Sequence, residues 1–162
     1  MKQLKLTVCV LSMLVVSLVE ASGSPVLEIS GNITALTKAS KVYTLSAEQF
    51  QAMPQSSITT ATTWTPVSKF TGVKMEEILR VTGAKGEFAQ VYALDDYSVR
   101  IPVADFKRYG LVLARSMNGK PLDASKFGPY FLVYPKDKYP KELNTPTAEA
   151  KFVWQVSRIV FQ

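Results

Sequence analysis

The sequence predicts an α+β protein, a single compact domain built on a mixed β-sheet. Segments with strand-like patterns outnumber helical ones, and the two kinds alternate irregularly along the chain, which is typical of this class. No repeat, low-complexity tract or block of like charge divides the 162 residues. A chain of this length normally forms one domain around a single core.

The first 21 residues have the pattern of a secretory signal peptide. Lys2 and Lys5 precede the apolar run 6–19, and small residues then suit cleavage after Ala21. The apolar run is shorter than the roughly 20 residues that a membrane span needs. We therefore expect residues 22–162 to form the mature domain, to be exported to the periplasm, and not to insert into the membrane once the signal is removed.

Composition narrows the possible chemistry of the mature chain. The one cysteine, Cys9, lies within the predicted signal, and the sequence has no histidine. The mature chain therefore offers no imidazole or thiolate to a metal and cannot form an internal disulfide. Cleavage would lower the formal net charge from +6 to +5, a modest surplus that favours solubility. We expect neither a metal site nor a nucleic-acid partner.

The N-terminal half is expected to begin with two strands, 26–33 and 41–45, because apolar and polar residues alternate up to a turn at Gly31. Ser46 can cap a short helix over 47–53 that Pro54 ends. The β-branched run 56–64 predicts a third strand. The segment 70–86 predicts a helix that ends at Gly83 and carries its apolar residues on one face: Val73, Ile78, Leu79 and Val81.

The C-terminal half reads mainly as strands. Two strands within 87–103 are separated by the acidic pair Asp95 and Asp96, and a short helical segment follows over 103–110. Further strands are expected over 111–115, 130–134 and 152–160, with a turn at Asn118 and Gly119. Residues 134–146, rich in lysine and proline, read as a long loop.

Catalytic patterns are scarce in this sequence. Without histidine, a Ser, Thr or Cys nucleophile has only lysine or carboxylate partners, which makes a hydrolase unfavourable. No phosphate-binding glycine motif occurs. The chain is instead rich in aromatic side chains that carry a hydrogen-bonding group, and several of these lie next to polar turns. Such an arrangement suits a pocket for a flat, polar, heteroaromatic ligand.

The order of several segments resembles the molybdopterin-binding domain of the sulfite oxidase family, in particular its short exported members. The segments are "FTGVKMEEIL", "LDDYSVRIPVADF", "VLARSMNGKPL", "FGPYFLVYPKD" and "FVWQVSRIVF", between about Thr60 and Phe161. The resemblance implies the fold of that domain. It also aligns Tyr97 with the active-site tyrosine of the enzymes.

Three departures from the enzymes are informative. Their molybdenum-ligating cysteine falls in a region that reads "ITTATTWTPVSK" here. Phe131 and Val153 stand where the resemblance implies a basic side chain that grips an anionic cofactor. The resemblance therefore implies a reduced pterin without molybdenum as the ligand. The expected ligand-binding residues are Trp64, Asp96, Tyr97, Arg115, Tyr130 and Tyr134, with no catalytic residue, and Trp154 is expected in the core behind them.

Three functions remain open at this stage. The preferred one is a non-catalytic pterin-binding regulator that docks on the periplasmic sensor domain of a membrane-bound enzyme of cyclic di-GMP, which is what some exported relatives resemble. The alternative is a minimal molybdopterin-dependent oxidoreductase, or its remnant, with an oxygen ligand replacing sulfur. The third is an interaction protein whose pocket no longer binds a ligand.

Overall fold

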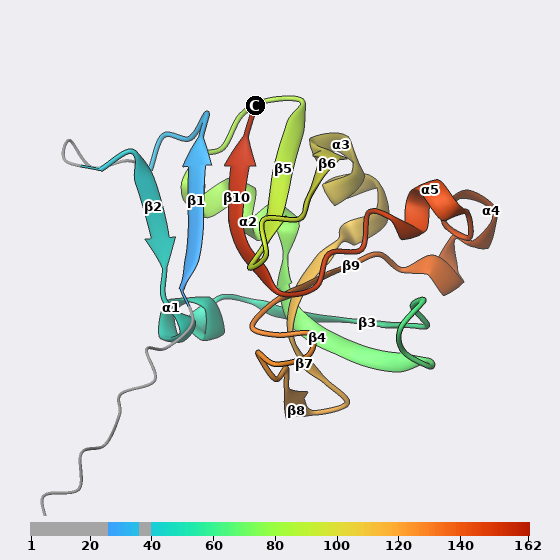
Figure 1. Ribbon diagram of the computed structural model, residues 1–162. Coiled ribbons are helices and arrows are strands. Elements are labelled where there is room, and N and C mark those ends of the chain that lie inside the picture. The colour runs from blue at the N-terminus through green and yellow to red at the C-terminus, as the bar shows by residue number, and fades with distance from the viewer. Residues whose placement is uncertain (1–25, 36–39) are drawn as a thin grey trace, which may run out of the picture.

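The computed structural model describes residues 26–35 and 40–162, so the predicted signal peptide lies outside the described residues. Two β-sheets pack around one core with short helices at their margins, as Figure 1 shows. The predicted single α+β domain with mixed pairing is confirmed. No helix in the described part of the chain is long and apolar enough to cross a membrane.

The first sheet has the strand order β2-β1-β10-β5-β6. Strand β1 pairs in parallel with the C-terminal strand β10, and every other pairing in this sheet is antiparallel, which makes the sheet mixed. Buried and partly buried residues alternate along β5, as expected for a sheet with one face on the core. The strands are β1 (Leu27–Gly31), β2 (Val42–Leu45), β5 (Phe88–Ala93), β6 (Ser98–Pro102) and β10 (Val156–Phe161).

The second sheet has the order β3-β4-β7-β8, and β9 also pairs with β7. All its pairings are antiparallel. Figure 1 shows this sheet below and to the right of the first, with the β3–β4 loop extending from it. The strands are β3 (Gln55–Thr60), β4 (Ser68–Lys74), β7 (Val112–Met117), β8 (Lys120–Pro121) and β9 (Phe131–Val133).

The helices are short and mostly connect strands. Helix α1 begins with the predicted cap at Ser46, whose hydroxyl accepts from the Gln49 N–H while the Gln49 side chain accepts from the Ser46 N–H. Helix α2 ends at Gly83, as predicted, in a left-handed conformation. The helical segments are α1 (Ala47–Ala52), α2 (Met75–Thr82), α3 (Val103–Asp105), η1 (Phe106–Gly110), η2 (Lys136–Lys138), α4 (Pro140–Leu143) and α5 (Pro146–Glu149).

The structure corrects the sequence prediction in four places. The strand predicted over 56–64 ends at Thr60 in β3, and residues 61–64 lie in the β3–β4 loop. Residues 70–74 belong to β4, because the chain there pairs with both β3 and β7 before α2 begins at Met75. The predicted loop 134–146 contains η2 and α4. The last strand begins at Val156, since the preceding residues leave the sheet and Val153 forms an isolated bridge with Leu132.

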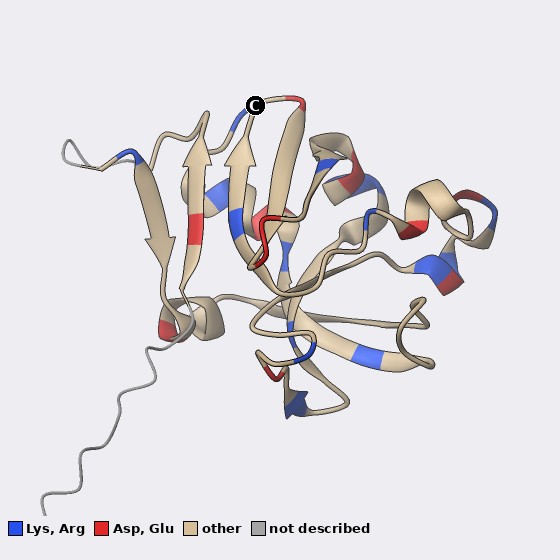
Figure 2. Cartoon of the chain, in the orientation of Figure 1, with Lys and Arg blue, Asp and Glu red and all other residues tan. Residues whose placement is uncertain are grey.

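The buried apolar side chains of both sheets form one continuous cluster. Among the large side chains, Tyr130, Tyr134 and Phe131 around β9 are completely buried. Charged side chains are spread over the surface, and Figure 2 shows lysine and arginine interspersed with aspartate and glutamate in the visible elements. Polar groups and aromatic rings therefore come together in the loops at the margin of the core.

Candidate functional site

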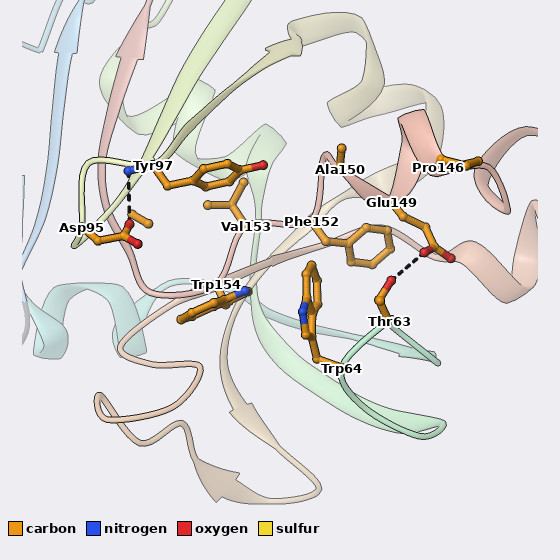
Figure 3. A pocket seen from close by; sticks show the side chains of 11 residues that line it. Thr63, Trp64, Asp95, Tyr97, Pro146, Glu149, Ala150, Phe152, Val153 and Trp154 are labelled. Atoms are coloured by element: carbon orange, nitrogen blue, oxygen red, sulfur yellow. Dashed lines mark hydrogen bonds between the residues drawn. The ribbon is translucent and has the colours of Figure 1, made fainter.

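A pocket of about 520 Å³ lies where three segments meet: the β3–β4 loop, the β5–β6 turn, and the chain from α5 to the start of β10. We call it the Trp64 pocket. Figure 3 shows aromatic rings from all three segments around it. Its lining comprises Thr63, Trp64, Ala93, Asp95, Tyr97, Pro146, Glu149, Ala150, Phe152, Val153 and Trp154.

The β3–β4 loop holds Trp64 in place through the hydroxyl of Thr62. That oxygen accepts from the Trp64 N–H at 3.2 Å and from the Thr65 N–H at 3.0 Å, a local turn that serine and threonine commonly stabilise. Trp64 remains 46% exposed. It meets the Trp154 indole edge to face, with ring centroids 6.5 Å apart. The two indoles thus form one apolar wall (Figure 3).

The β5–β6 turn carries Asp95 and Tyr97 on the pocket side. The Tyr97 N–H donates to Asp95 Oδ1 at 3.1 Å, as Figure 3 shows, and Asp96 between them has a φ of 62°. The left-handed conformation at Asp96 directs its carboxylate elsewhere, to Arg158 Nη2 at 3.4 Å. Tyr97 is 53% exposed at the rim.

Glu149 supplies a second carboxylate from α5. Its Oε1 accepts from Lys136 Nζ at 2.8 Å and its Oε2 from the Thr63 hydroxyl at 2.5 Å. The hydrogen bonds from Lys136 and then Thr63 hold the pKa of Glu149 below its ordinary value. Glu149 is therefore ionised at neutral pH, and it joins the β3–β4 loop to α5.

Charge in the lining has one sign. Asp95 and Glu149 are acidic, and no lysine or arginine is among the described residues that line the pocket. The remaining lining is mainly aromatic or aliphatic. Such a surface favours a flat apolar body with hydrogen-bond donors along its edge. In residues 26–35 and 40–162, no group of three or more His, Cys, Asp or Glu side chains is placed to hold a metal ion.

The structure does not bring the six predicted ligand residues together. Trp64 and Tyr97 line the Trp64 pocket. Asp96 turns toward Arg158 and lines a different surface depression. Arg115 lines a separate pocket on the second sheet.

Tyr130 and Tyr134 lie at either end of β9 and are completely buried, so their rings belong to the core. The Tyr134 hydroxyl donates to Asp105 Oδ2 at 3.0 Å, and Lys151 Nζ donates to the same oxygen at 2.8 Å. Burial, and then the charge of Asp105, raise the pKa of Tyr134 far above its usual range. This buried network fixes the chain just before Phe152, which lines the Trp64 pocket.

Sequence reasoning missed several lining residues. Trp154, expected in the core, is half-buried and faces the pocket because the chain before Val156 leaves the sheet. Asp95, rather than its neighbour Asp96, faces the pocket. Glu149 carried no sequence signal, since it follows residues 134–146, which read as a loop. Phe152 opens the predicted last strand, 152–160, and was not expected to contact a ligand. The acidic pair Asp95 and Asp96 was the available sequence signal for this part of the lining. It located the turn but did not indicate which of the two carboxylates faces the pocket.

A comparison with family models matches residues 27–137 to the oxidoreductase molybdopterin binding domain. No curated protein sequence matches the chain. Among solved structures, the chain is similar to the sulfane dehydrogenase SoxCD from Paracoccus pantotrophus, with a TM-score of 0.61 and 16% identity. That similarity covers 84% of this chain and 37% of that chain, so it concerns the fold of one part of the dehydrogenase.

The family match covers β1 to the start of η2, which includes Thr63, Trp64, Asp95 and Tyr97. The remaining lining, from Pro146 to Trp154, lies beyond the matched range. The sequence match and the fold agree, and the chain belongs to the oxidoreductase molybdopterin binding domain family.

Proposed function

We propose that the Trp64 pocket binds a reduced pterin that carries no molybdenum, and that the protein acts as a binding protein and not as a catalyst. The observation that carries this proposal is the combination of aromatic walls with two carboxylates and, among the described residues, no lining cation. A pterin is a flat bicyclic ring with an amino group and a ring N–H along one edge. Its faces suit aromatic stacking, and its edge suits a carboxylate.

Asp95 is the better candidate for the pterin edge. Both oxygens of Glu149 already accept hydrogen bonds, from Lys136 and from Thr63. The bond from the Tyr97 N–H reaches one oxygen of Asp95. A carboxylate can accept about four hydrogen bonds, so Asp95 retains capacity for a paired contact with an amino group and a ring N–H.

The family's complete cofactor does not fit this lining. Molybdopterin carries a phosphate, which needs cationic partners, and the lining presents two carboxylates instead. Hydroxyls occupy the stretch where the family resemblance places a thiolate ligand, and the hydroxyls of Thr62 and Thr65 are paired with each other at 2.9 Å. The pterin part alone fits the aromatic walls.

A molybdopterin-dependent oxidoreductase, or its remnant, is the second candidate. The family match favours it, since the matched domain is named for binding molybdopterin in oxidoreductases. The comparisons support this class of domain more directly than they support any signalling role. Elemental analysis of the purified protein distinguishes the two candidates, because stoichiometric molybdenum would favour the oxidoreductase and contradict a metal-free pterin site.

We further propose that the bound state is passed to the periplasmic sensor domain of a membrane-bound enzyme that makes or degrades cyclic di-GMP. The half-exposed Trp64 and Tyr97 at the pocket rim support this, because a docked protein could contact them. A neighbouring gene for such a membrane enzyme would support the proposal. A neighbouring gene for a haem-binding membrane subunit would instead favour the oxidoreductase.

The adjacent acidic residues give a matched test of ligand binding. Asp95→Asn removes the charge that faces the pocket, while its amide oxygen can still accept the Tyr97 N–H. We expect isothermal titration calorimetry with a tetrahydropterin to show affinity weakened about tenfold to a hundredfold, since a hydrogen bond to a charged group contributes about 1.5–3 kcal/mol.

Asp96→Asn is the control, because Asp96 contacts Arg158 outside the pocket and asparagine tolerates its left-handed backbone. Its affinity should equal that of the wild type. Equal affinities for the wild type and both variants would remove Asp95 from the site.

A further inference from the structure

A second pocket, of about 170 Å³, opens on the second sheet where β3, β4, β7 and β8 pass α1. It shares no lining residue with the Trp64 pocket. Its polar lining comes from Gln51, Gln55, Thr71, Arg115 and Ser116. We call it the Arg115 pocket. Its one charged lining side chain among the described residues is the guanidinium of Arg115.

A β-bulge directs Arg115 into this pocket. Ser116 pairs with Thr71 and Ala114 pairs with Gly72, which leaves Arg115 as the extra residue without a partner on β4. Bulges of this kind redirect a side chain from the regular alternation of a strand. Gly72 permits the close approach of the two strands, because a Cβ atom there would lie 2.0 Å from the carbonyl oxygen of Leu113.

The guanidinium of Arg115 lacks an acceptor that it needs. Its Nη1 atom is buried and has no hydrogen-bond partner within the described part of the chain. The ring of Tyr130 lies 6.0 Å from the guanidinium carbon, which is a weak contact with an aromatic face. A buried donor left without an acceptor destabilises the folded state, and more so when the group is charged. Arg115 also lines the pocket, so an oxyanion there would offset part of its positive charge.

The other polar groups of the pocket are largely occupied. The amide nitrogen of Gln55 donates to the carbonyl oxygens of Phe50 and Met53 at the end of α1. The hydroxyl of Thr71 is paired with that of Ser57 at 2.8 Å. By contrast, the Ser116 hydroxyl makes only a long contact of 3.5 Å with the Thr71 carbonyl oxygen. It can therefore donate to a ligand beside Arg115.

The electrostatic surroundings favour an anion. No aspartate or glutamate is among the described lining residues. Burial raises the pKa of the neighbouring Tyr130, while the charge of Arg115 lowers it and the charge of Glu48 on α1 raises it. Glu48 also accepts from the Ser46 hydroxyl at 2.8 Å. Arg115 is therefore the one charged group among the described residues that line the pocket.

We propose that the Arg115 pocket binds a small oxyanion, a carboxylate or phosphate group, through the guanidinium of Arg115 and the hydroxyl of Ser116. Arginine recognises both groups with paired N–H donors. The volume corresponds to roughly five or six water molecules at about 30 Å³ each. That space admits one such group and is small for a pterin, so this site is independent of the proposed pterin site.

Thermal unfolding in the presence of inorganic phosphate or sodium acetate tests the proposal, with sodium chloride at equal ionic strength as reference. A ligand that binds the folded state raises Tm. We expect the wild type to rise by about 2–4 °C at a ligand concentration several times the Kd. The larger rise identifies the preferred group, phosphate or carboxylate.

Arg115→Gln should abolish this rise, and Arg115→Lys, which keeps the charge without the paired donors, should reduce it by about half or more. Arg100→Gln is the control, since Arg100 is exposed and lies over the Phe88 ring on the other sheet, and it should keep the wild-type rise. If the glutamine variant does not fold, Ser116→Ala is measured with the lysine variant. The absence of a rise in the wild type, or equal rises in the wild type and the Arg115 variants, would overturn the proposal.

Discussion

Two neighbouring carboxylates in the β5–β6 turn have opposite surroundings. Asp95 lines the Trp64 pocket, while Asp96 extends toward Arg158. The difference arises from the left-handed backbone at Asp96 and from the Tyr97 N–H that anchors Asp95. Aspartate tolerates this backbone conformation better than most residues. At the scale of single residues, local backbone hydrogen bonds thus decide which acidic group a ligand meets.

Tyr134 allows a prediction at the residue scale. Its hydroxyl and Lys151 share one oxygen of the buried Asp105. Tyr134→Phe keeps the ring packing and removes one of these hydrogen bonds, so the free energy of unfolding should fall by about 1.5–3 kcal/mol in urea denaturation. Tyr139→Phe is the control, because the Tyr139 hydroxyl makes no hydrogen bond in the described part, and it should change stability by less than about 0.5 kcal/mol. Similar losses in both variants would contradict this role of the Asp105 network.

The sequence identified candidate aromatic side chains but did not indicate which of them are buried in the core and which line the pocket. Trp64 lies beside the pocket because its loop leaves the sheet after Thr60. Tyr130 and Tyr134 have the same residue type as Tyr97 but flank a buried strand, so they became core. Whether such a ring is buried depends on pairing between strands that are distant in sequence, and no local sequence pattern predicts that pairing.

At the scale of elements, the β3–β4 loop is tied to the C-terminal helices. The Ala61 N–H donates to Asp137 Oδ2 at 3.1 Å, and the Asp137 N–H donates to Thr60 Oγ1 at 3.2 Å. The bond from Thr63 to Glu149 adds a third link. These links close one side of the Trp64 pocket before any ligand enters. A pocket that is formed in advance loses less conformational entropy on binding.

Glu149 gives a pH-dependent prediction at this scale. The pKa of Glu149 in the folded protein is lower than the ordinary value of 4.5. At a pH between the folded pKa and 4.5, the unfolded chain therefore binds more protons than the folded protein does. The stabilisation is therefore complete above about pH 4.5 and is lost as pH falls through the folded pKa. Thermal unfolding between about pH 7 and pH 3 should show a steeper loss of Tm for the wild type than for Glu149→Gln. If Tm falls with pH equally in the wild type and in Glu149→Gln, the ionised Glu149 does not stabilise the connection between the β3–β4 loop and α5.

Element prediction succeeded where the local signals were strong. The cap at Ser46 and the stop at Gly83 placed the ends of α1 and α2. It failed for β4, because its residues pass directly into α2 and their apolar spacing suited a helix. It also missed α4 and α5, which have only four residues each and depend on tertiary contacts such as the link to Glu149.

At the scale of the whole molecule, the Trp64 pocket depends on segments that are far apart in the sequence. Its β3–β4 loop and β5–β6 turn lie within the family match, and the wall from Pro146 to Trp154 lies beyond it. The family therefore explains the fold and part of the pocket, and this chain's own C-terminal segment completes it. The class of fold could be predicted from the sequence, whereas the full lining required the structure.

The intrinsic fluorescence of the protein tests the pterin proposal most directly. The chain has two tryptophans, Trp64 and Trp154, and both line the pocket, so their emission reports on that pocket alone. A pterin stacked against the wall that these two indoles form should quench the emission during titration with a tetrahydropterin. We expect saturable quenching at one ligand per protein with a Kd in the micromolar range, about −8 kcal/mol. Quenching that stays linear and unsaturated up to about 1 mM pterin would contradict the account.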